Sequence, residues 1–226
     1  MAGGSSTSDG TAALEKLCRA YWFPIYAHAR RRGYNPEDAQ DLTQEFFAQL
    51  IARRDFANVE RSKGKFRSFL LACLNHFLAK DWRGRNAIKR GGGQAFIPLD
   101  TALAEERLAT DHQISGSMSS DRLYDQRWAM TVMEQSLDNL RQEWVKLDKG
   151  GLFEEFKIFL SEPAEDGAYA SLAARLNMTP SAVATTIHRL RNRYRDLVRA
   201  TLAQTVTTPL ELEEEMRYLL EVLSEP

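Results

Sequence analysis

The sequence predicts an all-α protein of two small helical domains joined by a flexible linker, with an acidic helix after the second domain. Three observations support this fold class. Apolar residues recur at helical spacing along most of the 226 residues, and no stretch alternates polar and apolar residues as a strand does. Clusters of glycine and serine interrupt the helical pattern near residues 91–93 and 111–120. Because 43% of the residues are hydrophobic, each domain has enough apolar side chains for a core.

The first domain is expected to open with two helices. Residues 14–32 form a helix or a broken pair, because Pro24 forces a kink or a restart and Gly33 is a natural stop. The next helix starts at Asn35-Pro36, with asparagine as the N-cap and proline in the first turn, and it runs to about residue 54. Its inward face is an apolar row: Ala39, Leu42, Phe46 and Leu50.

A basic helix is expected next, from Lys65 to about residue 83. Between residues 61 and 93 the chain has nine lysine or arginine residues and one acidic residue, although the net charge of the whole chain is −1. This segregation of charge indicates an anionic partner for this part of the molecule. Phe69, Cys73 and Phe77 recur every four residues, and we expect them to share the core-facing side.

The breaks along the chain predict its domain boundaries. Helical periodicity stops after residue 90, and the linker that follows has room for at most one short helix. Periodicity resumes near residue 121 and continues to Trp144, followed by a short apolar helix at residues 152–160. The expected divisions are a disordered tail at 1–10, a domain at 11–90, a linker at 91–120, a domain at 121–205 and an acidic amphipathic extension at 206–226.

A helix-turn-helix is expected within the second domain, at residues 169–193 (YASLAARLNMTPSAVATTIHRLRNR). Asn177 stands where the tight turn needs a left-handed residue, and Thr179-Pro180 provides an N-cap and a first helical residue. The inward stripe of the second helix is Val183, Ile187 and Leu190, and it leaves the opposite face for a DNA major groove and its phosphates. The DNA-facing residues we expect are Ser181, Ala184, Thr185, His188, Arg189, Arg191 and Arg193. The alternative is a helical hairpin that only packs.

The helix that begins at Pro36 has an acidic face opposite its apolar row. Asp38, Asp41, Gln44 and Glu45 fall on this face. Carboxylates are poorly suited to contact with DNA, so a cationic protein surface is the better partner, and a merely solvated face is the alternative. No histidine, metal cluster or phosphate loop accompanies these carboxylates, and we expect no enzyme.

The basic helix and its flanks combine cations with aromatic residues. Aromatic rings in a basic groove stack on unpaired bases, at roughly 1–3 kcal/mol for each base. Such a groove suits a separated DNA strand. The candidate residues are Lys63, Phe66, Arg67, Asn75, Lys80, Trp82, Arg83 and Arg85.

Composition excludes several other classes of protein. The chain has two cysteines, which lie in apolar helical patterns and indicate core packing in a reducing cytosol. Its four scattered histidines give no zinc spacing, so we expect neither a metal site nor a cofactor. No apolar run is long enough to span a membrane, and we expect a cytoplasmic protein.

Three segments together resemble a bacterial RNA polymerase sigma factor of the extracytoplasmic-function (ECF) type. They are residues 38–47 (DAQDLTQEFF), residues 64–70 (GKFRSFL) and the helix-turn-helix, in this order. The resemblance covers residues 12–90 and 121–202, which would be the sigma region 2-like and region 4-like domains. It implies a dissociable subunit that binds core RNA polymerase and directs promoter recognition, melting and transcription initiation.

The resemblance also implies a role for each group of residues. Asp41, Gln44 and Glu45 would contact the clamp helices of the polymerase β′ subunit. The basic group would bind the melted minus-ten element, and the helix-turn-helix would read the minus-thirty-five element and touch the β flap. Regulatory partners would be an anti-sigma factor or a Ser/Thr kinase, with Thr43 as a conceivable phosphorylation site.

The C-terminal extension exceeds this two-domain pattern. Thr208-Pro209 starts an acidic helix with apolar residues on one face, namely Leu212, Met216, Leu219, Leu220 and Leu223. Such a stripe needs a surface to cover it, either on the protein's own domains or on a regulator. Two other functions stay open: a stand-alone helix-turn-helix regulator that binds duplex operator DNA, and a helical adaptor that binds only proteins.

Overall fold

A computed structural model describes residues 20–52, 66–84, 101–111, 119–161, 165, 167–206 and 208–224. Every regular element in these ranges is a helix, and none of them contains a strand. The all-α prediction is therefore confirmed. The predicted tail at residues 1–10, the loop before the basic helix and most of the predicted linker lie outside the described ranges.

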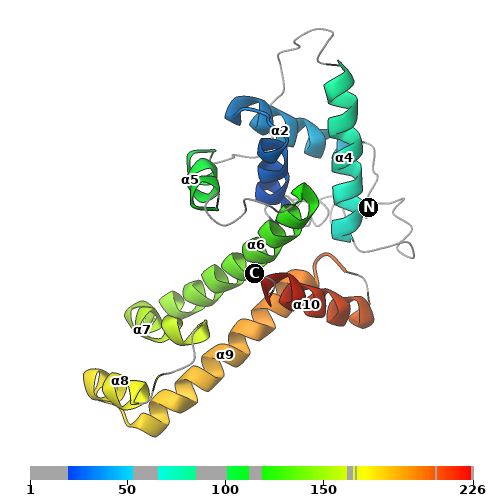
Figure 1. Cartoon of the computed structure of the whole chain (residues 1–226). Coiled ribbons are helices and arrows are strands. Elements are labelled where there is room, and N and C mark those ends of the chain that lie inside the picture. Colours follow the sequence, from blue (N-terminus) through cyan, green and yellow to red (C-terminus); the bar gives the residue numbers. More distant parts are fainter. Residues whose placement is uncertain are drawn as a thin grey trace, which may run out of the picture. The chain divides into compact units, whose positions relative to one another are not determined.

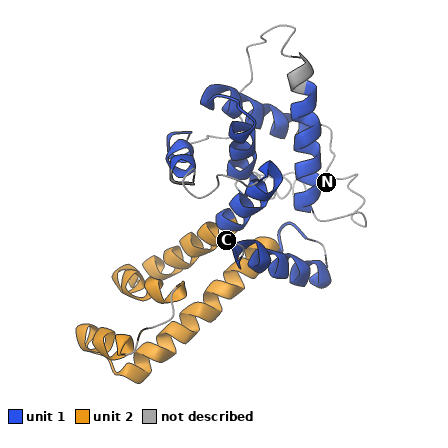
Figure 2. Ribbon diagram, in the orientation of Figure 1, with its two compact units in different colours: residues 1–131, 203–226 blue, residues 132–202 orange. Residues whose placement is uncertain are grey.

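Residues 20–31 form a first helix, and further helical elements follow it (Figure 1). They are α2 (Pro36–Ala52), α4 (Phe66–Gly84), α5 (Thr101–Asp111), α6 (Ser120–Lys146), α7 (Gly150–Phe156), the 3-10 helix η1 (Lys157–Leu160), α8 (Ala168–Leu176), α9 (Pro180–Leu202) and α10 (Pro209–Ser224). The chain forms two compact units (Figure 2). Unit 1 contains Met1–Thr131 and Ala203–Pro226, and unit 2 contains Val132–Leu202.

The first helix and α2 are separated by a tight turn. The helix of residues 20–31 is uninterrupted at Pro24, so of the two predicted forms, one helix or a broken pair, the structure has the single helix in this range. Gly33 ends the helix with a φ of 92°, as expected for a residue that stops a helix in the left-handed region. The predicted N-cap of α2 is confirmed, because the Asp38 backbone N–H donates to Asn35 Oδ1 over 2.8 Å.

The core of unit 1 lies between α2 and its neighbours. All four residues of the predicted apolar row on α2 are buried. On α4 the prediction is wrong by one position, because Leu70, Leu74 and Leu78 are the buried residues, whereas Phe69, Cys73 and Phe77 are half-buried. The Phe77 ring instead packs edge-on against Phe46 of α2, with 5.6 Å between the ring centroids.

Helix α5 lies within the segment predicted as a linker and belongs to unit 1. Its Glu105 carboxylate accepts two hydrogen bonds from Arg30, at 2.7 and 2.8 Å, and a third from the Tyr26 hydroxyl at 2.6 Å. Ala104 and Leu108 are buried on the same helix. Two nitrogen atoms of the Arg30 guanidinium bond to the two oxygens of the Glu105 carboxylate, and this two-point contact holds α5 against the first helix.

Unit 2 is built around one apolar cluster. Residues of α6, α7, η1, α8 and α9 contribute to it, including Leu140, Phe153, Leu172 and Ile187. Asn177 connects α8 to α9 with a φ of 52°, which confirms the predicted left-handed turn. The predicted inward stripe of α9 is also confirmed, because its three residues are buried: Val183, Ile187 and Leu190.

Helix α10 belongs to unit 1. Thr208 and Glu211 form a capping box, in which each residue's side chain accepts a hydrogen bond of 3.2 Å from the other's backbone N–H. Leu219 is buried, but Leu220 is 60% exposed, so only part of the predicted apolar stripe of α10 is buried.

The turn at Asn177 gives a test of the fold of unit 2. An L-residue with a Cβ is disfavoured at positive φ, whereas asparagine tolerates it and glycine prefers it. Asn177→Ala should reduce the free energy of unfolding by about 1 kcal/mol, as measured by urea denaturation. Asn177→Gly is the matched control and should leave the stability nearly unchanged. Equal losses in both variants would contradict a conformational role for this residue.

Candidate functional site

The acidic face of α2 is accessible. Asp41 and Glu45 are exposed one turn apart, while Asp38 and Gln44 are half-buried. Glu45 accepts a hydrogen bond of 2.9 Å from Gln49, and Asp38 accepts one of 3.0 Å from Asn35. The helix therefore presents two carboxylates to solvent on the side opposite its buried apolar row.

Thr43 does not belong to this accessible face. It is 1% exposed, and its hydroxyl donates a hydrogen bond of 2.7 Å to the Ala39 carbonyl oxygen. A kinase has no access to this oxygen in the structure. The interpretation of Thr43 as a phosphorylation site is therefore not supported.

The residues predicted to bind a separated DNA strand, which we call the strand-binding group, lie in several different environments. Lys63 and Arg85 lie outside the described residues, and for Trp82 and Arg83 only the helical backbone is described. Lys80 is exposed on α4, and Phe66 is half-buried with its ring edge-on to Tyr21 at 5.5 Å. The two remaining residues, Arg67 and Asn75, have specific polar partners within unit 1.

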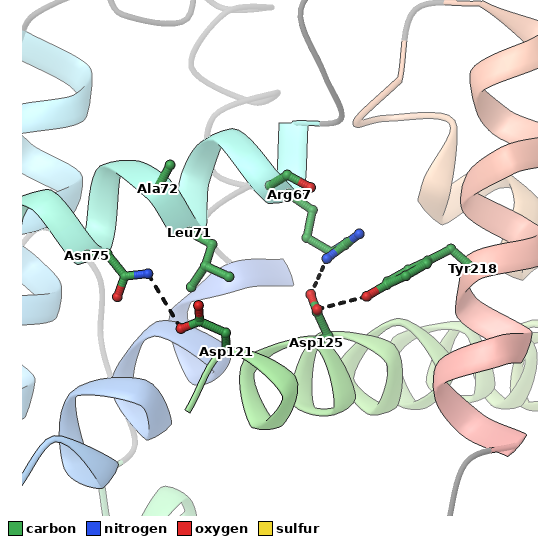
Figure 3. Close-up of a pocket in the computed structure, with 8 residues that line it drawn as sticks. Arg67, Leu71, Ala72, Asn75, Asp121, Asp125 and Tyr218 are labelled. Carbon is green, nitrogen blue, oxygen red and sulfur yellow. Dashed lines mark hydrogen bonds and ion pairs between the residues drawn. The ribbon is translucent and has the colours of Figure 1, made fainter. Parts of the chain in front are cut away.

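Arg67 is 5% exposed and lies in a cluster formed by α4, α6 and α10 (Figure 3). Its guanidinium makes an ion pair with Asp125 of α6, and its Nε atom is 3.8 Å from Glu215 Oε2 of α10. The guanidinium carbon lies 4.1 Å from the ring centroid of Tyr218 and 5.0 Å from that of Trp128. The Tyr218 hydroxyl donates a hydrogen bond of 2.8 Å to Asp125 Oδ2. We call these five residues the Arg67 cluster.

A cavity of about 490 Å³ lies beside this cluster. Its polar walls are Arg67 and Asn75 from α4, Asp121 and Asp125 from α6, and Tyr218 from α10 (Figure 3). The cavity therefore adjoins two residues of the predicted strand-binding group, and α10 supplies one wall.

Asn75 belongs to a second polar network in unit 1. Its Oδ1 atom accepts a hydrogen bond of 2.8 Å from Arg32 and lies 3.0 Å from His28 Nε2, while its amide nitrogen lies 3.5 Å from Asp121 Oδ1. His28 is buried, and its Nδ1 atom lies 3.2 Å from the Ser120 carbonyl oxygen. Burial lowers the pKa of His28, although the hydrogen bonds to Asn75 and Ser120 oppose this shift.

The predicted DNA-facing residues of α9 fall into two groups. Ser181, Thr185, His188 and Arg189 are exposed, and Ala184 is half-buried. The other two residues bond within unit 2. Arg193 makes a two-point ion pair with Glu143 of α6 at 2.5 and 2.9 Å, and Arg191 Nε donates to the Phe159 carbonyl oxygen over 2.8 Å.

These two arginines therefore position α9 within its unit. The Arg193–Glu143 ion pair lowers the pKa of Glu143 and raises the pKa of Arg193. Arg193 is nevertheless exposed, as are the four residues of the row along the first turns of α9.

Two further polar residues adjoin the predicted sites. Asn192 is exposed one turn after His188 and lies 3.0 Å from its Nε2 atom. Arg32 is exposed beside Asn75. The run of arginines at residues 30–32 could have indicated Arg32 as a candidate for binding an anion. The sequence alone did not show that Arg32 lies next to Asn75 of α4, more than forty positions away.

Within the described ranges, no cluster of histidine, cysteine and acidic side chains has the composition of a metal site. The same ranges contain no helix long and apolar enough to cross a membrane.

Comparison with protein families identifies one domain of this chain. Residues 17–88 match the family model for sigma-70 region 2. The match spans the first helix, α2 and α4, and thus both the acidic face and the Arg67 position. Neither the curated proteins nor the solved structures yielded a match. The chain therefore carries a sigma-70 region 2 domain, which covers less than half of its 226 residues.

The buried ion pair of Arg67 leads to a prediction about stability. Asp125→Asn removes the closest counter-charge of a buried guanidinium, which should lower the free energy of unfolding by about 3 kcal/mol. Asp121→Asn, one turn earlier on α6, is the control, because Asp121 is exposed and should contribute less than about 1 kcal/mol. Chemical denaturation of both variants measures the difference. Equal effects would show that Asp125 does not stabilise Arg67.

His28 predicts a pH dependence of stability. The pKa of His28 is lower in the folded protein than in the unfolded chain, where it is about 6.5. The unfolded chain therefore binds more protons than the folded protein at mildly acidic pH. The stability contributed by neutral His28 is complete above pH 6.5 and is lost as the pH falls below this value. Urea denaturation should show that His28→Gln costs more stability at pH 7.5 than at pH 5.5. The same substitution at exposed His76 is the control, and a pH-independent cost at His28 would contradict the assignment.

Proposed function

We propose that the chain is a sigma factor of the extracytoplasmic-function type, in which unit 1 binds core polymerase and the melted minus-ten element and unit 2 reads duplex DNA. The observation that carries the proposal is the domain at residues 17–88, which combines an exposed acidic helix with a basic one. The small size of 226 residues suits this type. Sigma factors act with RNA polymerase in the cytoplasm, and we assign this chain to the same compartment.

In this proposal the acidic face of α2 contacts the clamp helices of the β′ subunit. The exposure of Asp41 and Glu45 supports it, since a docking surface must be reachable before the partner binds. Asp38 and Gln44 at the margin would orient the contact. Complementary charge across such an interface accelerates association and selects the correct register.

The basic helix α4 and its flanks hold the separated strand. Exposed Lys80 would neutralise phosphate, whereas Arg67 and Asn75 line the cavity beside it. Affinity from lysine and arginine contacts to phosphate decreases steeply with salt, because bound counterions are released. The near-neutral net charge of the chain agrees with weak binding to DNA before polymerase is engaged.

Unit 2 would act as the region 4-like domain. Ser181, Thr185, His188 and Arg189 form its exposed row on α9, and Asn192 extends the row by one turn. Hydroxyl, imidazole and guanidinium groups on one side of a helix are suited to base edges and phosphates in the major groove.

Charge reversal on α2 tests the proposal. Asp41→Lys together with Glu45→Lys should reduce binding to purified core polymerase by at least about tenfold, because like charges oppose docking. The measurements are pull-down with core enzyme and run-off transcription. Glu221→Lys, a charge reversal at an exposed position outside α2, on α10, is the control and should retain binding. A chain that binds no polymerase but shifts palindromic duplex DNA by itself would instead be a stand-alone helix-turn-helix regulator.

A further inference from the structure

Helix α10 contributes two side chains to the Arg67 cluster, and their chemistry resembles that of the phosphate and the base of a DNA strand. Glu215 presents a carboxylate to the guanidinium, and Tyr218 presents the face of an aromatic ring. A DNA strand offers a phosphate and an unstacked base, and arginine binds phosphate by charged hydrogen bonds and stacks on bases. The C-terminal helix thus gives Arg67 a carboxylate 3.8 Å from its Nε atom, an ion pair longer than a hydrogen bond, and the face of an aromatic ring.

Helix α10 is separated from the rest of unit 1 in the sequence. The chain leaves unit 1 after Thr131, forms unit 2, and returns to unit 1 at Ala203.

Docking buries only part of the surface of α10. Of its sixteen residues, Glu215 and Leu219 are fully buried, whereas Leu210 and Leu220 are 70% and 60% exposed. A ligand that binds the released form more tightly than the docked form shifts the balance towards release. After release, Asp125 and Trp128 of α6 would still orient the guanidinium, with one face open.

We propose that α10 is an intramolecular latch: Glu215 and Tyr218 occupy the side of α4 on which Arg67 and Asn75 bind single-stranded promoter DNA, and they hold the protein in a form with low affinity for DNA. This inference rests on the proposed function, because it takes α4 as the strand-binding helix. The strand and α10 compete for Arg67. Tyr218 also forms one wall of the cavity shared by Arg67 and Asn75, so departure of α10 widens the opening (Figure 3).

Substitutions on the inner face of α10 test the latch in the full-length chain. The probe is a fluorescein-labelled single-stranded DNA of about 20 nucleotides, long enough to follow a basic groove, and its binding is measured by fluorescence anisotropy. Tyr218→Ala combined with Glu215→Gln should lower the dissociation constant about tenfold, because Arg67 is freed from two partners. Glu221→Gln makes the same charge change on an exposed position of α10 and should leave the constant unchanged.

A third variant shows whether Arg67 receives the strand. Adding Arg67→Gln to the double variant should return the affinity to the wild-type value or below it. Thermal denaturation checks that each variant melts cooperatively. If the double variant fails to fold, Tyr218→Phe and Glu215→Gln are examined singly, since each removes one polar group and retains most of the packing.

Pull-down with core polymerase separates failure of the latch from failure of the proposed function. The latch requires that the α10 variants bind polymerase as the wild type does and bind the DNA more tightly. Unchanged DNA affinity with intact polymerase binding overturns the latch alone. A DNA gain that persists in the Arg67→Gln background also overturns it. Absence of polymerase binding in the wild type overturns the proposed function.

Discussion

The charge of Arg67 imposes the strongest constraint on unit 1. An ionised guanidinium that is 5% exposed needs counter-charge and hydrogen-bond acceptors close by, because burial without them is costly. Asp125 provides the ion pair, Glu215 adds a second carboxylate, and two aromatic rings cover the remaining surface. These partners come from α6 and α10, so one side chain of α4 connects the matched domain to two later parts of the chain.

The two sides of α4 have different neighbours within unit 1. Leu70, Leu74 and Leu78 are buried and anchor the helix, and half-buried Phe77 reaches Phe46 of α2. Arg67 and Asn75 lie instead with the polar partners around the cavity. Because the same core fixes α2, the acidic face of that helix stands on a rigid support. A preorganised surface binds a partner at a lower entropic cost than a loop does.

Sequence reasoning succeeded where neighbouring residues determine the outcome. The N-cap at Asn35, the left-handed turn at Asn177 and the inward stripes of α2 and α9 depend on local backbone chemistry and on helical periodicity. It failed on α4, where leucines rather than aromatic residues face inward. This error arose because two neighbouring faces of the helix are both apolar, and tertiary packing decided which of them is buried.

The sequence by itself determined that the chain is helical, where most helices begin, and which segments carry acidic, basic and helix-turn-helix character. These properties follow from spacing and capping over a few residues. Only the tertiary structure decided that Arg67 is enclosed, that Arg193 pairs with Glu143, and that α10 belongs to unit 1. Each of these contacts joins residues at least 50 positions apart. No local pattern specifies such a partner, because the free energy of a long-range contact depends on the fold that brings the two groups together.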